Sequence, residues 1–478
     1  MTAILADAPE RDLIATALDT TLVVEAAAGT GKTTEIVNRI VAVLAEGRAT
    51  AKSLVAVTFT GKAAGELKLR LRAALERRRI AEHDPTRRTN LENALARLEE
   101  AHVSTIHAFC DELLAERPVE ARVDTDFRLM DEGRAELVFR DAFTRWFQGA
   151  LEKPGEGLRR VLRRQGSGSV MERLFTSARK LAEWREYPAL WRRDPFDRDA
   201  AVDAAVDAVR ALATATENPK WTGDYLYKET APARELMAEI TRSEVDRTRD
   251  YDGVEGALVA LSRDNDFARA RAGSGERYSV THLRADVRAL HQATVQILAA
   301  FAEQANADVA PLLQRELLTS VEAYDDAKRR AGTLDYTDQL LRARDLLRDR
   351  VDVRGEFQGR FSHIFVDEFQ DTNLLQAELL LLLAANDAST SDWRKVKVKP
   401  GKLFIVGDPK QSIYRFRRAD VHVYEEVKQQ LVRDGATCVY LRTSFRSMPT
   451  IQRVVNAAFA PLMTGETSGQ ARYVPLAP

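Results

Sequence analysis

The chain of 478 residues is 45% hydrophobic and 30% charged, which is typical of a soluble globular protein of about three domains. Its net charge of -1 does not by itself indicate a polyanionic ligand, so any contact with phosphates must come from local clusters of Lys and Arg. Two cysteines, Cys110 and Cys438, are too few for a disulfide framework or a four-thiolate metal site, which favours a cytoplasmic location. The longest apolar run, Leu379–Ala385, is far shorter than the ~20 residues of a membrane span, so we expect no membrane contact.

The first ~115 residues alternate short apolar runs with helical patterns. Strands are predicted at Leu22–Ala26 and Leu54–Thr58, and they are followed by helices over Thr33–Glu46 and Lys62–Arg78. This order of strands and helices predicts a parallel sheet with crossover helices.

Between about residues 116 and 309 the sequence is rich in Arg, Ala and Glu and has no strong strand pattern. Strand patterns return at His363–Val366, Leu403–Gly407 and Cys438–Leu441. We therefore expect an α/β fold that carries a large, all-helical insertion.

A glycine-rich loop joins the first predicted strand to the first predicted helix. Gly29 and Gly31 let the backbone curl so that its N–H groups point at phosphate oxygens, and the following helix adds the positive end of its dipole. Lys32 can reach the β- and γ-phosphates of a nucleotide, and Thr33 can offer its hydroxyl to Mg²⁺. The alternative, a chance Gly-rich turn, is disfavoured by the strand before the loop and the helix after it.

Two adjacent carboxylates, Asp367 and Glu368, directly follow the predicted strand His363–Val366. Such a pair suits phosphoryl transfer, in which one carboxylate holds the metal and the other orients or deprotonates the attacking water. We assign Asp367 to Mg²⁺ and Glu368 to the water. Taken alone, a solvated acidic turn is an equal alternative, and the phosphate loop favours the catalytic interpretation.

A polar loop follows the predicted strand Leu403–Gly407, and such loops bind ligands at the carboxyl ends of parallel strands. Within it, Gln411 is a candidate sensor of a γ-phosphate. Tyr414 and Phe416 alternate with arginines, which suits single-stranded nucleic acid because bases stack on aromatic rings while phosphates pair with Arg. In the alternative interpretation, both aromatic residues belong to the core and the arginines to the surface.

Together these motifs resemble those of superfamily 1 DNA helicases of the UvrD/RecB/AddA group. Six motifs and a segment preceding the acidic motif match in the family's order, at residues 26–33, 57–64, 104–110, 334–341, 367–371, 407–417 and 441–447. The resemblance implies an ATP-dependent DNA helicase that moves 3′ to 5′ on single-stranded DNA in recombination and double-strand-break repair. It also implies ATP and Mg²⁺ as cofactors, with single-stranded and duplex DNA and an AddB- or RecC-like protein of a helicase–nuclease as partners.

The resemblance assigns nucleotide contacts to particular residues. Arg446 would contact the γ-phosphate, and Phe445 would stack on adenine with Arg39 opposite. The remaining nucleotide-binding residues are those of the loop: Ala26, Ala27, Ala28, Gly29, Thr30, Gly31, Lys32, Thr33 and Thr34.

The resemblance also implies a path for DNA. Thr58, Phe59 and His107 would touch the strand, and Tyr414 and Phe416 would stack on its bases. Without the motif, a buried histidine with its hydrogen bonds satisfied is the simpler interpretation of His107.

In domain terms, the resemblance implies a RecA-like P-loop NTPase sheet, motor domain 1A, built from residues 1–115 and 310–435. Residues 116–309 would form the helical domain 1B, and residues 436–478 would begin a second RecA-like domain, 2A. The family's later motifs, including one with an arginine finger, lie beyond the last motif matched here. We therefore expect a truncated, N-terminal portion of a motor that hydrolyses little ATP, because such a finger contributes about 10³–10⁵-fold in rate.

Three positions depart from the family pattern. Glu10 stands where a glutamine often reads adenine, and a carboxylate lacks the amide donor. Gly61 replaces the usual Asn, and Ala26 replaces the first glycine of the loop. Two other functions therefore remain open, a P-loop ATPase that does not act on DNA and a non-catalytic recombination scaffold.

Overall fold

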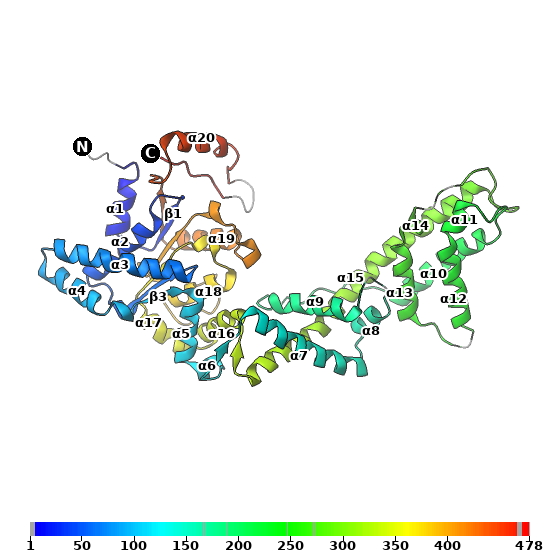
Figure 1. Cartoon of the computed structure of the whole chain (residues 1–478), viewed down its shortest axis with the longest axis horizontal. Coiled ribbons are helices and arrows are strands. Elements are labelled where there is room, and N and C mark those ends of the chain that lie inside the picture. Colours follow the sequence, from blue (N-terminus) through cyan, green and yellow to red (C-terminus); the bar gives the residue numbers. More distant parts are fainter. Residues whose placement is uncertain are drawn as a thin grey trace. The chain divides into compact units, whose positions relative to one another are not determined.

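The computed structural model describes residues 5–477 except 165, 167, 188, 246, 270, 272 and 466–470. The chain forms two compact units, which we call the sheet unit (residues 1–130 and 332–478) and the helical unit (residues 131–331) (Figure 1). The strands of the sheet unit are β1 (Leu22–Ala26), β2 (Leu54–Thr58), β3 (His102–Thr105), β4 (Arg128–Leu129), β5 (Thr333–Leu334), β6 (His363–Val366), β7 (Leu403–Gly407) and β8 (Thr437–Leu441).

Helices cover both sides of these strands. The α-helices of the sheet unit are α1 (Ala8–Thr16), α2 (Lys32–Ala45), α3 (Gly61–Ala81), α4 (Pro85–Ala96), α5 (Ile106–Glu116), α6 (Pro118–Ala121), α16 (Tyr336–Asp349), α17 (Val351–Arg360), α18 (Leu374–Ala384), α19 (Val421–Arg433) and α20 (Pro449–Phe459). Its short 3₁₀ helices are η1 (Ala51–Ser53), η2 (Leu98–Glu100), η3 (Phe369–Asp371), η4 (Pro409–Gln411) and η5 (Arg415–Arg417).

Six strands form one parallel sheet in the order β3-β2-β6-β7-β1-β8. Alternate residues of β1 face opposite sides, so that Leu22 and Val24 pack with helices α1 to α4 while Val23 packs with α5 and α16 to α19. The two apolar cores are therefore the two faces of one sheet, and the unit has three layers. This confirms the predicted α/β fold with a parallel sheet.

The strand expected to open a second domain at residue 436 instead belongs to this first sheet. All five residues of β1 pair in parallel with β8, from Leu22 opposite Thr437 to Ala26 opposite Leu441. Val439 and Leu441 fill the same core as α1 to α4, and this burial is what fixes the strand at the edge beside β1. The apolar pattern of residues 438–441 shows that a strand exists but does not show which sheet it joins.

The boundaries of the helical unit also differ from the expected 116 and 309. Helix α5 packs its apolar face into the core of the sheet unit, so the unit changes only at residue 131. At the other end, α15 runs unbroken from Arg284 to Arg330. A composition change cannot mark the end of a domain when one helix continues through it.

The helical unit is built on α15. Its helices are α7 (Glu132–Glu152), α8 (Glu156–Leu162), α9 (Val170–Glu183), α10 (Arg198–Thr216), α11 (Tyr225–Glu229), α12 (Ala231–Ser243), α13 (Tyr251–Ser262), α14 (Asn265–Ala268) and α15 (Arg284–Arg330). Two separate apolar clusters pack along α15, one including Leu298 and the other Leu317. Between them, buried Asp308 accepts hydrogen bonds from Arg160 (2.6 Å) and Arg193 (2.7 Å), so ion pairs join the two clusters.

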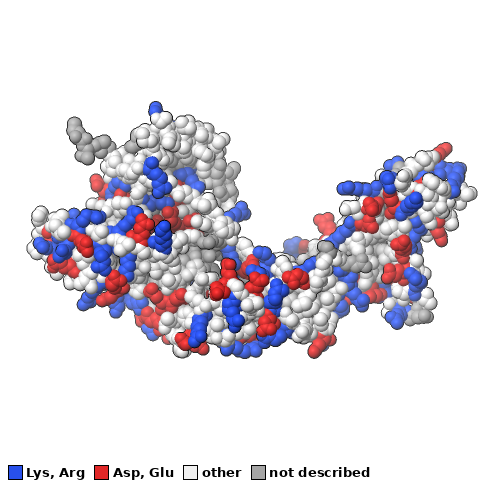
Figure 2. All heavy atoms as spheres, viewed as in Figure 1, with Lys and Arg blue, Asp and Glu red and all other residues white. Residues whose placement is uncertain are grey.

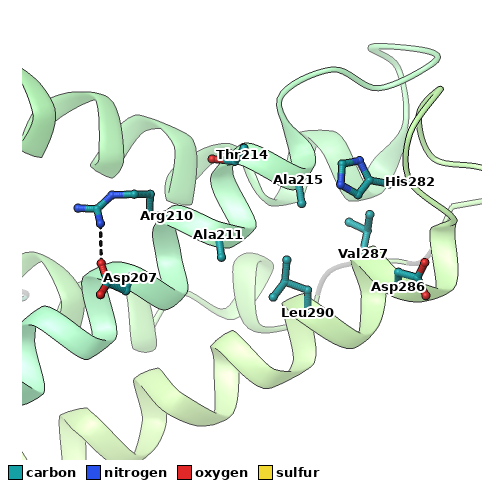
Figure 3. Close-up of a pocket in the computed structure, with 9 residues that line it drawn as sticks. All are labelled: Asp207, Arg210, Ala211, Thr214, Ala215, His282, Asp286, Val287 and Leu290. Atoms are coloured by element: carbon teal, nitrogen blue, oxygen red, sulfur yellow. Dashed lines mark hydrogen bonds and ion pairs between the residues drawn. The ribbon is translucent and has the colours of Figure 1, made fainter.

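A pocket of about 470 Å³ lies between α10 and the start of α15. Ala211 and Ala215 of α10 face Val287 and Leu290 of α15 across it (Figure 3). The pocket contains no predicted site residue, because all of those lie in the sheet unit.

Basic and acidic side chains are interspersed on the face of the molecule shown in Figure 2, in keeping with the net charge of -1. Among the described residues, no helix is both long and apolar enough to cross a bilayer.

Candidate functional site

The register of the sheet gathers the predicted motifs at one edge. Thr58 of β2 pairs with Thr105 of β3, and Val366 of β6 pairs with Ile405 of β7. Ala26 of β1 lies at the same end of the sheet, beside β7 and β8. Each motif starts at or just beyond one of these strand ends, so parallel topology places segments far apart in sequence side by side.

The glycine-rich loop has the backbone that its sequence predicts. Gly29 and Gly31 have positive φ angles of 79° and 89°, a region that disfavours residues with a Cβ. The hydroxyl of buried Thr30 donates to the carbonyl of Ala27 at 2.8 Å and braces the turn, while Ala28 is exposed. The loop therefore leads into α2 with the N-terminus of that helix open to a ligand.

Lys32, at the start of α2, reaches across to the acidic motif. Its Nζ lies 2.5 Å from Oε2 of Glu368, and the backbone N–H of Glu368 donates to Oδ1 of Asp367 at 2.9 Å. Burial and the adjacent Glu368 raise the pKa of Asp367 to about 6, although Lys32 opposes the shift. The structure thus brings Lys32, Asp367 and Glu368 together, with half-buried Thr33 and exposed Thr34 in the first turn of α2.

Phe445 and Arg446 lie against the loop from the segment after β8. The N–H of Phe445 donates to the carbonyl of Gly29 at 2.8 Å, and a Cβ built at Gly29 would lie only 2.5 Å from Cβ of Arg446. The ring of Phe445 is 63% exposed and the side chain of Arg446 is also exposed. Both side chains are therefore accessible beside the phosphate loop, as the resemblance implies.

The expectation that Arg39 lies opposite Phe445 is wrong. Arg39 is buried and donates to the carbonyls of Ile14 (2.7 Å), Ala17 (3.0 Å) and Thr20 (2.9 Å). It lies on the face of α2 that packs against α1, where its guanidinium satisfies carbonyls at the end of that helix. Its role is structural.

Arg11 is the cation that lies over the ring of Phe445, with its Cζ 5.3 Å from the ring centroid. It also donates to Glu35 (2.6 Å), to the carbonyl of Thr30 (2.9 Å) and to Asp7 (2.9 Å). The sequence contains one signal for this role, the i,i+4 pair of Asp7 and Arg11 on a helix just before β1.

Asp7 ties α1 to the segment after β8. Its carboxylate accepts the backbone N–H groups of Arg442 (2.8 Å) and Thr443 (2.9 Å). Burial would raise the pKa of Asp7, but the hydrogen bonds from Arg11 and Thr443 outweigh it and lower this pKa to about 2. The carboxylate therefore stays ionised and holds Phe445 near the loop.

The Gln411 loop is held from two sides. Nε2 of Gln411 donates to Oδ2 of Asp408 at 2.7 Å, so the amide is hydrogen-bonded within its own loop. Gln370, within the acidic motif, donates to Oε2 of Glu368 (2.8 Å) and accepts the N–H of Asp408 (2.8 Å). Gln370 is a second site residue that the sequence alone does not single out.

An aromatic cluster stands at the same sheet edge. The rings of Phe59 and Tyr414 stack with centroids 4.8 Å apart, and Phe416 lies 5.7 Å from Tyr414. Phe416 is 77% exposed, so the alternative that it belongs to the core is wrong. Thr58, which precedes Phe59, is buried and donates to the carbonyl of Thr60 at 3.0 Å.

His107 forms a separate aromatic pair. Its ring meets that of exposed Tyr336 edge-on, with centroids 6.0 Å apart. Burial lowers the pKa of His107, so its imidazole is neutral at pH 7. His107 can therefore offer an uncharged hydrogen-bonding edge but no fixed positive charge.

Comparison with known proteins agrees with these motifs. Residues 8–431 match the family of the UvrD/REP helicase N-terminal domain. The chain is 28% identical to an ATP-dependent helicase/nuclease subunit of Syntrophomonas wolfei, over 96% of this chain and 38% of that protein. It is 27% identical to the proteins of the same name from Staphylococcus carnosus (94% of this chain, 38% of that protein) and Anoxybacillus flavithermus (94% and 40%). The chain thus spans about two fifths of the length of these relatives. It belongs to the UvrD/REP helicase N-terminal domain family.

Proposed function

We propose that this chain is the ATP-hydrolysing and DNA-binding portion of an ATP-dependent DNA helicase. The observation that carries the proposal is that the Lys32–Glu368 contact and the stacked Phe59–Tyr414–Phe416 cluster occupy one edge of one sheet. A single loop, residues 408–416, leads from the first to the second. Such proximity lets hydrolysis and strand movement act on each other.

The charged groups fit a nucleotide with Mg²⁺. Asp367 and Thr33 would hold the metal, and Oδ1 of nearby Asp371 is buried with no hydrogen-bond partner among the described residues. Bound Mg²⁺ would neutralise charge on the β- and γ-phosphates. Lys32 would turn from Glu368 to the phosphates, which releases Glu368 to orient the attacking water.

Gln411 and Arg446 would respond to the γ-phosphate from opposite sides of the loop, while Phe445 and Arg11 would enclose the base. A ring and a guanidinium can both stack on adenine, which tolerates Phe in place of Tyr. Because Glu10 cannot donate, adenine would be held by stacking rather than by an amide at this position.

The DNA strand would lie across the aromatic cluster, with Thr58 and His107 at neighbouring strand ends. We propose 3′ to 5′ movement in recombination and double-strand-break repair. The relatives are named as subunits of a helicase/nuclease, which supports an AddB- or RecC-like partner. We also propose the helical unit as domain 1B and the residues after β8 as the start of domain 2A.

The test uses the full-length natural protein and measures ATP hydrolysis and affinity for a poly(dT) strand. Phe416→Ala should weaken strand affinity by about 1–3 kcal/mol because each stacked base contributes that much. Ile80→Ala on α3 is the control, since Ile80 is 74% exposed and lies outside the aromatic cluster. Unchanged affinity in Phe416→Ala would favour an ATPase that does not act on DNA.

Glu368→Gln separates a motor from a scaffold. It should retain ATP and the DNA strand while turnover falls by at least about 100-fold, because the attacking water loses its orienting carboxylate. A wild-type protein that binds both ligands without turnover would show that the non-catalytic scaffold is correct.

A further inference from the structure

Gln370 connects the acidic motif to the loop that carries the aromatic cluster. Its side chain is only 2% exposed, and it makes hydrogen bonds from both ends of its amide. Nε2 donates to Oε2 of Glu368 at 2.8 Å, and Oε1 accepts the backbone N–H of Asp408 at 2.8 Å. A third bond, from the hydroxyl of Ser412 to the carbonyl of Gln370 at 3.1 Å, ties the same loop two residues before Tyr414.

The close fit around Gln370 depends on Gly407. A Cβ built at Gly407 would lie 2.8 Å from Oε1 of Gln370 and 3.3 Å from its backbone nitrogen. Because real Cβ atoms do not approach so closely, glycine at the end of β7 is what lets the two strand ends meet. The Gln370 contact is therefore rigid on both sides.

Only a glutamine-like amide can make this connection. A carboxylate at position 370 has no donor for Glu368 and would add a like charge, while an apolar side chain would leave the N–H of Asp408 buried and unpaired. Asparagine is one methylene shorter and cannot reach both partners at these distances.

We propose that Gln370 is a positioning residue that transmits the position of the 408–416 loop to the carboxylate of Glu368, so that a DNA strand on the aromatic cluster accelerates ATP hydrolysis. The inference rests on the proposed function and extends it. When a base displaces Tyr414 or Phe416, the loop moves at Asp408 and Ser412, and the amide carries that movement to Glu368. Gln370 touches neither the nucleotide nor the strand in this scheme.

The test compares ATP hydrolysis with and without poly(dT) in the full-length natural protein. Gln370→Met keeps the length of the side chain but removes both hydrogen bonds, and it should lower the ratio of stimulated to basal kcat about tenfold, as expected for a misplaced catalytic group. KM for ATP and the affinity for poly(dT) should change far less. Gln376→Met is the matched control, because Gln376 is a buried glutamine that accepts the N–H of Asn373 at the start of α18, away from Glu368.

Ser412→Ala provides a second variant with little risk of misfolding, since Ser412 is half-buried and loses a single bond. It should lower the stimulation ratio by about twofold to threefold. Unchanged stimulation in both Gln370→Met and Ser412→Ala, or an equal loss in Gln376→Met, would overturn the role of Gln370. Failure of the proposed function is distinguishable, because the wild-type protein would then show no stimulation by poly(dT).

Discussion

Nζ of Lys32 lies 2.5 Å from Oε2 of Glu368, although 336 positions separate the two residues in the chain. The phosphate loop and the acidic motif therefore neutralise each other directly across the edge of the sheet. The same cation that would bind the phosphates holds the carboxylate that would orient water, so nucleotide binding must exchange one partner for the other.

Lys32→Met should lower kcat/KM for ATP by about 100-fold or more, because a preorganised cation at the phosphates is lost. Steady-state ATP hydrolysis measures the effect. Lys395→Met is the control, since Lys395 is an exposed lysine paired with Asp392 on the surface. A loss below about threefold in Lys32→Met would contradict the assignment of the loop as the phosphate site.

Asp367→Asn should stabilise the protein in the absence of Mg²⁺ while it removes metal-dependent hydrolysis. The pKa of Asp367 is raised to about 6, so the folded state holds a proton that the unfolded state releases near pH 4. Stability from this group is present at low pH and is lost as the pH rises through about 6.

Urea unfolding at a series of pH values measures this linkage. At pH 7, Asp367→Asn should raise the free energy of unfolding by about 1–2 kcal/mol after allowance for solvent screening. The gain should shrink as the pH falls from 6 to 4. A gain that is independent of pH would show that Asp367 is not the titrating group.

Gly29→Ala should disturb the contact between the loop and the segment after β8. A Cβ at Gly29 would clash with Arg446, and φ at this position is +79°. We expect a loss of about 1–3 kcal/mol in unfolding free energy together with a higher KM for ATP. Gly65→Ala in α3 is the matched control, because no atom lies within 4 Å of its Cβ and the change should stabilise the helix by about 0.5–1 kcal/mol.

Arg39→Ala should unfold more easily by about 2–4 kcal/mol, because three carbonyls at the end of α1 lose their donor and a cavity remains. Burial lowers the pKa of Arg39 to about 10, so the guanidinium is still charged at pH 7. Phe445→Ala should instead raise KM for ATP with little loss of stability, since its ring is exposed. Thermal unfolding and ATP titration distinguish the two, and the reverse pattern would restore Arg39 to the adenine site.

Several features of the site follow from short stretches of sequence. The positive φ angles at Gly29 and Gly31, the helix that starts at Lys32 and the strand before Asp367 all agree with local patterns. These features depend on backbone freedom and apolar periodicity within a few residues, so residue types and spacing determine them.

The partners across the sheet were decided by the tertiary structure. Arg11 rather than Arg39 lies over Phe445, β8 joins the first sheet rather than a second one, and Gln370 bridges Glu368 to Asp408. Each contact joins elements far apart in the chain, and its geometry depends on which faces are buried together. The sequence by itself therefore determined the phosphate loop, the acidic pair and the family, whereas long-range packing alone decided which side chains meet around them.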